Sequence, residues 1–258
     1  MNYRDIEFQV EDDIGFITLS RPEKRNALSM NLMAEMIDLL KSVKKDSRVR
    51  VVIIKAEGPV FSSGHDLSEM VEGDAVFYRS VFNLCTEMME AIRDLPQPVI
   101  AQVQGMATAA GCQLVATCDL AVASQEARFA TPGVRIGLFC HTPQVPLSRA
   151  VGRKRALEML FTGRAISAEE AERYGMLNKV VPAECLAEEA LSLAKHIAQA
   201  SPLILALGKQ SFYRQIELEE HGAYDYTKEV MSLNAMTEDA HEGISAFLQK
   251  RTPQWKGK

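Results

Sequence analysis

Two stretches of small residues could present free backbone N–H groups to an anion. The first is FSSGHDLSEM, residues 61–70, in which an apolar strand ends in small residues and Gly64 just before a helix. The second is GMATAAGCQLVATCD, residues 105–119, in which glycines and alanines let another backbone approach closely and a helix start adds unpaired donors. Two such N–H groups that converge would form an oxyanion hole. Each stretch taken alone is better explained as a tight strand–helix connection in a crowded core.

The residues before and between these stretches predict alternating strands and helices. FQVEDDIGFITLSRP, residues 8–22, alternates apolar and polar residues around Asp12-Asp13, which predicts a β-hairpin closed by Pro22. VRVVIIKAEG, residues 49–58, is a β-branched run typical of a parallel strand that is covered on both faces. Between them a helix is predicted with Ser29 as its N-cap, because apolar residues recur at spacings of three and four: Met33, Met36, Ile37, Leu40 and Val43.

The alternation continues to about residue 183. It predicts a helix near 75–94, a strand at 98–105, a small-residue helix at 108–117, and strands near 119–124 and 177–181. Ser167 and Glu170 predict a capping box, and Gly175 predicts the end of that helix. Beyond residue 183 only helical patterns occur. The order predicts an α/β core over residues 1–195 and a helical region over 196–258.

Composition excludes several classes of protein. The net charge of −5 argues against nucleic acid as a partner, because binding a phosphate backbone needs a concentrated basic surface. The five cysteines contain no C-x-x-C pair, which predicts reduced thiols, and the five histidines show no metal-ligand spacing. The acidic N-terminus does not resemble a targeting peptide, and no apolar run approaches a membrane span. We therefore expect a soluble, cytoplasmic protein without a metal site or a membrane partner.

Taken together and in order, the motifs resemble the crotonase, or enoyl-CoA hydratase/isomerase, superfamily over essentially the whole chain. The motifs are RPEKRNALS, FSSGHDL, PVIAQVQGMATAAGCQLVATCDLAVAS, FATPGVRIGL, LFTGRAISAEEAERYGMLNKVVP and FLQKRTPQW. FSSGHDL, AGCQLVA and FATPGV followed by GLFC are most similar to the branch called enoyl-CoA hydratase domain-containing protein 3. The resemblance implies a spiral of ββα turns and C-terminal helices that build a homotrimer or a dimer of trimers. It also implies a coenzyme A thioester as the ligand, with no separate cofactor.

The resemblance assigns the two stretches a chemical role. Members of the superfamily stabilise a thioester enolate or related oxyanion with two backbone N–H groups, and the matching positions are His65 and Ala110. Because these donors belong to the main chain, the histidine and the alanine need not abolish them. The imidazole of His65 is equally well interpreted as a substrate contact or as a solvated loop histidine.

The resemblance also identifies two missing acids. Family hydratases use two glutamates to add water across a double bond, and the matching positions here are Gln113 and Gly133. An amide can orient water but cannot exchange a proton near pH 7, and glycine does neither. Ordinary enoyl-CoA hydration is therefore doubtful.

Few side chains could replace these acids. Asp66, Asp119 and Glu126 match structural or peripheral positions, so capping or solvated roles are expected. His141 falls where some isomerases and dehalogenases of the superfamily carry a working aspartate, and histidine can transfer protons near neutrality. A loop histidine, or one packed beside Cys140, is the alternative.

Coenzyme A needs a local basic cluster on an acidic protein. Arg21, Lys24 and Arg25 with Lys250, Arg251 and Lys256 are the available groups, and simple surface charge is the alternative. The resemblance implies the following residues for binding of the substrate or its coenzyme A: Arg25, Ala27, Ser63, Gly64, His65, Asp66, Leu67, Ser68, Ala110 and Gly111.

Two classes of function remain open. The first is an acyl-CoA lyase or isomerase that keeps the oxyanion hole and uses altered acid/base groups. The second is an acyl-CoA-binding protein with little turnover, in a regulatory role. A hydrolase with Ser62 or Ser63 as nucleophile is weaker, because no G-x-S-x-G motif is present.

Overall fold

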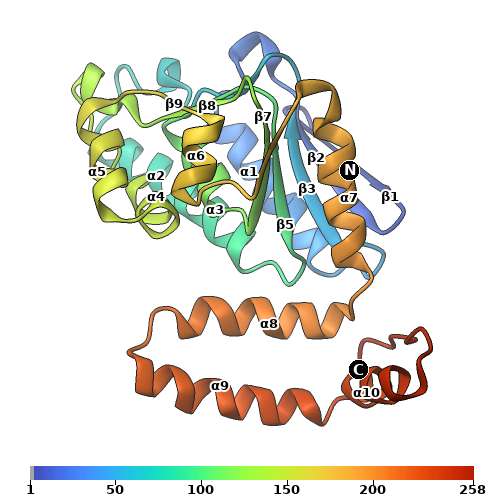
Figure 1. Cartoon of the computed structure of the whole chain (residues 1–258). Helices are drawn as coiled ribbons and strands as arrows, with labels where there is room; N and C mark the ends of the chain where they lie inside the picture. Colours follow the sequence, from blue (N-terminus) through green and yellow to red (C-terminus); the bar gives the residue numbers. More distant parts are fainter. Residues whose placement is uncertain (1–2) are drawn as a thin grey trace.

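The computed structural model describes residues 3–258, which form a two-sheet core followed by helices (Figure 1). The larger sheet has the order β1-β2-β3-β5-β7-β10. Its strands are β1 (Ile6–Glu11), β2 (Ile14–Leu19), β3 (Val51–Ala56), β5 (Val99–Val103), β7 (Leu120–Ser124) and β10 (Lys179–Val181). The smaller sheet has the order β4-β6-β8-β9, with strands β4 (Val60–Ser62), β6 (Met106–Thr108), β8 (Arg128–Ala130) and β9 (Ile166–Ser167).

The chain crosses between the two sheets once in every turn of the fold. β3, β5 and β7 lie next to one another in the larger sheet, and the strands that follow them, β4, β6 and β8, are neighbours in the smaller sheet. Helices α2 (Ala75–Arg93), α3 (Ala110–Thr117) and α4 (Gln144–Val151) follow β4, β6 and β8 in that order. This is the predicted spiral of ββα turns.

The first elements form as their local sequence dictates. Asp12 and Asp13 take positive φ values of 48° and 67°, which closes the two-residue turn between β1 and β2. α1 (Met30–Val43) begins after Ser29, whose hydroxyl accepts the Leu32 N–H at 3.1 Å. Both predictions are confirmed.

Further helices complete the core. They are α5 (Arg153–Thr162), α6 (Ala168–Tyr174) and α7 (Leu186–Ala198), with short 3₁₀ segments at Pro22–Lys24, Leu67–Glu69, Pro132–Ile136 and Ala183–Cys185. Ser167 and Glu170 form the predicted capping box of α6, which ends at Gly175 in the left-handed region. The sequence did not predict α4 or α5. The expected helix at 108–117 begins at Ala110, because residues 106–108 pair as β6.

The larger sheet is buried on both faces at β3, as the β-branched run of that strand predicts. One face, including Val52 and Ile54, packs in the main hydrophobic cluster with residues of α1, α2 and α3. The other face, including Val51 and Ile53, packs with Ala190 and Ala194 of α7, which runs along that face (Figure 1).

The C-terminal segment contains α8 (Pro202–Gln215), α9 (Glu220–Ala235) and α10 (Glu238–Gln249), which lie beyond the end of α7 (Figure 1). The division predicted between residues 195 and 196 falls inside α7, which continues to Ala198. α8 returns to the core through the Lys209 ammonium, which lies 2.7 Å from the Asp119 carboxylate. Among residues 3–258 no single helix is long and apolar enough to cross a membrane. One bent pair, Ala183–Ala198 with Pro202–Gln215, has the length and composition only when both segments are counted together.

Candidate functional site

The candidate site lies at the carboxyl edge of the smaller sheet. β4, β6 and β8 are parallel neighbours that end at Ser62, Thr108 and Ala130. The carboxyl ends of parallel strands meet at one edge, where ligands of α/β folds commonly bind. The segments that carry His65, Ala110 and Thr131 therefore start side by side.

Close contacts join the first two of these segments. The Thr108 hydroxyl donates to the Ser63 carbonyl oxygen at 3.0 Å. A Cβ added to Gly64 would lie 2.9 Å from the Ala109 Cβ and 3.2 Å from the Ala110 nitrogen. A Cβ on Gly111 would overlap the Ser62 carbonyl oxygen. Small residues are thus required here because two backbones touch.

Two backbone N–H groups at this junction are unpaired within residues 3–258. His65 bridges Leu28 as a parallel neighbour, but the two hydrogen bonds of the bridge use the N–H groups of Leu28 and Asp66. Ala110 is the first residue of α3, so its N–H has no partner inside the helix. The donors predicted for an oxyanion hole therefore stand on adjoining segments.

The backbone just before Ala110 is strained. Ala109 has φ 49° and ψ −118°, a conformation that glycine favours at the first central position of a type II′ turn. Its own N–H donates to the Ala130 carbonyl oxygen at 2.9 Å, which links this turn to the end of β8. Such strain persists only where surrounding contacts hold it, and it is common at functional sites.

Gln113 occupies the first predicted acid position. Its side chain is 4% exposed, and its Oε1 atom is buried without a hydrogen-bond partner. Gln113 also lines a cavity of about 490 Å³ bounded by α2, α3, α4 and α8, together with Met89, Val115, Thr142 and Phe212 among others. The carboxamide therefore borders this cavity, but it cannot act as an acid or a base near pH 7.

Gly133 stands at the second predicted acid position, and the structure leaves no room there for a side chain. A Cβ there would lie 2.8 Å from the Leu138 carbonyl oxygen and 3.0 Å from the Cys140 Sγ atom. The loop after β8 thus fills the space that a side chain at position 133 would need.

The imidazole of His65 is enclosed rather than solvated. Both ring nitrogens are buried without a partner that meets hydrogen-bond geometry, and the ring meets Phe82 of α2 edge-on at 5.6 Å. Burial lowers the pKa of His65, and the nearby Leu28 carbonyl opposes that shift only in part. The sequence did not predict this burial, because Phe82 belongs to another element, the helix α2.

His141 is exposed, and its ring lies 5.0 Å from the Phe139 ring. Its neighbour Thr142 lines the cavity that Gln113 lines, whereas His141 itself does not. The role predicted for His141 in proton transfer stays a prediction.

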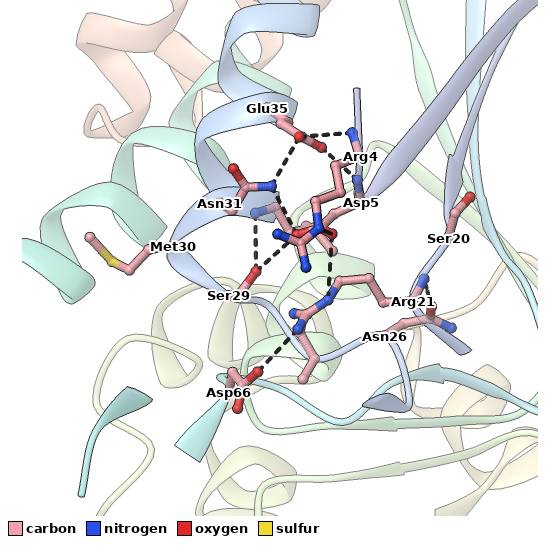
Figure 2. A network of polar contacts seen from close by, with 12 residues as sticks. Arg4, Asp5, Ser20, Arg21, Asn26, Ser29, Met30, Asn31, Glu35 and Asp66 are labelled. Carbon is pink, nitrogen blue, oxygen red and sulfur yellow. Dashed lines mark hydrogen bonds and ion pairs between the residues drawn. The ribbon is translucent and has the colours of Figure 1, made fainter. Parts of the chain in front are cut away.

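A polar network holds the segment that carries His65. Arg21 is 15% exposed and lies between Asp5 and Asp66, at 3.7 and 3.3 Å (Figure 2). Asp66 caps the short helix Leu67–Glu69 by accepting the Ser68 N–H at 3.2 Å, and it also accepts the Ser68 hydroxyl. The Ser68 hydrogen bond, with a smaller contribution from Arg21, lowers the pKa of Asp66. The expected capping role of Asp66 is confirmed.

The remaining predicted coenzyme A residues lie around this segment. The Arg25 carbonyl oxygen accepts the Ser63 N–H at 3.0 Å, and Ala27 is buried just before the Leu28–His65 bridge. Leu67 is exposed on the short helix.

Within one chain, the N-terminal and C-terminal groups of the predicted basic cluster lie far from each other. Arg25 follows the carboxyl end of β2, whereas Lys256 lines a groove with Arg50 beside the amino end of β3. β2 and β3 are parallel, so Arg25 and Lys256 lie at opposite ends of the strands. Strands of six residues separate these ends by about 20 Å. Arg251 and Lys256 also pair with Glu242 and Glu238, at 2.6 and 3.0 Å.

Comparison with known proteins settles the family. The model of the family described as enoyl-CoA hydratase/isomerase matches residues 9–258. The chain belongs to this family. It is 52% identical over 247 residues to the rat enoyl-CoA hydratase domain-containing protein 3. The aligned residues cover 95% of this chain and 82% of the relative. This agrees with the branch that the motifs indicated.

Solved structures of the family have the same fold. The crystal structure of human enoyl coenzyme A hydratase domain-containing protein 3 matches with a TM-score of 0.95 and 50% identity, covering 98% of this chain and 100% of that one. An enoyl-CoA hydratase from Mycobacterium smegmatis matches with a TM-score of 0.95 and 45% identity, covering 98% and 99%. The predicted family and fold are confirmed.

One prediction from the sequence is wrong. A cytoplasmic protein was expected, but the rat relative and its mouse and human counterparts are all named as mitochondrial. Composition and the N-terminal residues could not reveal this. Within residues 3–258 no group of three His, Cys, Asp or Glu side chains could hold a metal ion.

Proposed function

We propose that this family member binds acyl-CoA thioesters and stabilises a thioester enolate or related oxyanion with the N–H groups of His65 and Ala110. The observation that carries the proposal is the junction of Gly64 with Ala109 and Ala110, where two unpaired donors stand on touching backbones. Preorganised donors of this kind contribute roughly 10²–10³ each in rate. The reaction class is that of a lyase or isomerase, with coenzyme A as part of the substrate and no further cofactor.

The side chains argue for altered acid/base chemistry. Gln113 can orient a polar group of the ligand through its unpaired Oε1 atom, and the space at Gly133 is filled by the Leu138 carbonyl. Neither residue can activate water as a glutamate does. We therefore expect chemistry at the enolate rather than ordinary hydration.

Coenzyme A is proposed to bind across an oligomer. The helical region exposes large apolar side chains on α9 and α10, which favours association with further copies as a homotrimer or a dimer of trimers: Met231, Leu233, Ile244, Phe247 and Leu248. A second copy could also bring its C-terminal basic residues to Arg25 of the first. The mitochondrial names of the relatives support the mitochondrion as the compartment.

The proposal is tested by calorimetry of the purified protein with acetyl-CoA and a medium-chain acyl-CoA. We expect micromolar dissociation constants that rise with ionic strength, because phosphate contacts are screened by salt. The free fatty acid of the same chain length is the control and should bind more weakly. No heat with either thioester at high protein concentration would overturn the proposal.

An acyl-CoA-binding protein with weak turnover is the alternative. The observation that favours it is the lack of space at Gly133, which excludes a carboxylate at the second predicted acid position. Incubation with a panel of acyl-CoA thioesters, followed by mass spectrometry of the products, separates the two. Turnover of any member identifies an enzyme, and binding without turnover identifies the alternative.

A further inference from the structure

Three side chains on the segments that follow adjacent strands carry buried polar atoms without a partner that meets hydrogen-bond geometry within residues 3–258. They are both ring nitrogens of His65, the Oε1 of Gln113 and the Oγ1 of Thr131, on the segments that follow β4, β6 and β8. Buried polar atoms of folded proteins are almost always paired, so a group of exceptions needs an explanation. A polar ligand at this edge supplies one, and among these three side chains only His65 titrates near neutrality.

The charges around His65 leave its imidazole electrically isolated. On its own segment Asp66 is paired with Arg21 and Ser68, and in the loop before α1 the Arg25 side chain is exposed. On α2 the ring meets Phe82, the charged Arg79 is exposed, and burial keeps the Cys85 thiol protonated by raising its pKa to about 12. Only burial and the Leu28 carbonyl shift the pKa of His65, and the net effect favours the neutral, basic form.

The position of His65 places a base beside the proposed oxyanion hole. Its own backbone N–H is one of the two donors, so its ring lies within one side-chain length of the thioester oxygen. The carbon next to the thioester carbonyl, C2, is bonded to the atom that carries this oxygen. A neutral imidazole within reach of a C2 hydrogen can act as a general base, and substrate binding must bring one of the buried ring nitrogens into contact with that hydrogen.

We propose that the imidazole of His65 removes a proton from C2 of the bound acyl-CoA, an inference that rests on the proposed function. In this step the C2–H bond breaks and its electron pair forms a C1=C2 double bond. The carbonyl π pair moves to the thioester oxygen, which the N–H groups of His65 and Ala110 stabilise, and a ring nitrogen takes the proton. The reverse step returns a proton from the imidazolium to carbon, so no oxidant, reductant or water is consumed.

The test is exchange of the C2 hydrogens of butyryl-CoA with deuterium in D₂O, followed by mass spectrometry. Butyryl-CoA has no double bond to hydrate, so exchange reports enolate formation alone. His65→Gln should slow exchange by roughly 10²–10⁴ while butyryl-CoA affinity stays within a few-fold, because a base acts in the transition state. His196→Gln removes an exposed histidine of α7 and is the matched control, with exchange at the wild-type rate.

The pH dependence supplies a second readout. Wild-type exchange should rise with pH through a limb below the usual histidine pKa of about 6.5 and then level off, since burial lowers the pKa of His65 and the neutral form is the base. His65→Gln should lose this limb. Because the limb is measured on the wild-type protein, its absence would overturn the inference even if His65→Gln did not fold.

The other outcomes are also decisive. If the slow exchange and the lost limb follow His141→Gln instead of His65→Gln, the exposed histidine is the base and the inference is wrong. If wild-type protein binds butyryl-CoA but does not exchange C2 hydrogens, the inference fails while binding stands. If no acyl-CoA binds in calorimetry, the proposed function itself fails.

Discussion

The two halves of the candidate site differ in what they are made of. The half around Gly64 and Ala110 consists of main-chain N–H groups on segments held together by close contacts and hydrogen bonds. The half around Gln113 and Gly133 depends on side chains, and there the sequence predicts an amide and a glycine at the positions where family hydratases carry glutamates. A main-chain donor survives almost any substitution that preserves the backbone path, whereas a carboxylate is lost in one substitution. The main-chain donors can therefore be retained when substitutions at positions 113 and 133 change the reaction.

The largest expected effect concerns the side-chain half. Hydration of crotonyl-CoA by the wild-type protein should be slower than that of a two-glutamate enzyme by at least about 10²–10⁴, the usual loss for one positioned acid or base. Gln113→Glu should raise hydration above background, because it restores a carboxylate in a buried site that the cavity reaches. Steady-state absorbance of crotonyl-CoA measures both.

Gly133→Glu is the instructive contrast to Gln113→Glu. The new Cβ would lie 2.8 Å from the Leu138 carbonyl oxygen, so the loop must move to accommodate it. The double variant with Gln113→Glu should therefore gain further hydration activity only if the loop moves, and its melting temperature should fall. Wild-type turnover on the order of hundreds per second would mean that the acid positions have been matched wrongly.

A smaller effect on the reaction rate is expected from a substitution that separates the backbone segments of Gly64 and Ala110. Gly64→Ala should slow C2 exchange of butyryl-CoA by roughly 10²–10³, because its Cβ would press on Ala109 and on the Ala110 nitrogen. Gly137→Ala is the matched control, since Gly137 has a similar positive φ of 77° but nothing within 4 Å of its added Cβ. It should cost only about 1–2 kcal/mol of stability and leave exchange unchanged. Equal exchange rates in the two variants would refute a role for the junction.

Local sequence rules predicted the elements that frame the site. The Asp12-Asp13 turn, the Ser29 cap and the Ser167 capping box each depend on residues a few positions apart, so the sequence contains the whole cause. The order of motifs predicted the family, and with it the two donor positions.

The parts that could not be predicted depend on contacts between distant segments. β4, β6 and β8 have three residues each, too short for a periodic signal, and they pair with one another across long stretches of sequence. The burial of His65 depends on Phe82 in α2, and the lack of space at Gly133 depends on the path of the loop through Leu138. None of these contacts follows from spacing along the chain.

The smallest expected effect tests whether the main-chain half is held under strain. Ala109 has φ 49° and ψ −118°, and a residue in such a region costs about 1–3 kcal/mol. Ala109→Gly should relieve this cost, less the roughly 0.5–1 kcal/mol that glycine loses in entropy on folding. We expect a net gain near 1 kcal/mol, seen as a rise of about 2–4 °C in melting temperature for a chain of this size. C2 exchange should stay near the wild-type rate, because contacts around Gly64 and the bond from Ala109 to Ala130 still fix the turn. If exchange falls tenfold or more while stability rises, the alanine itself orients the Ala110 donor, and this half of the site depends on a side chain after all.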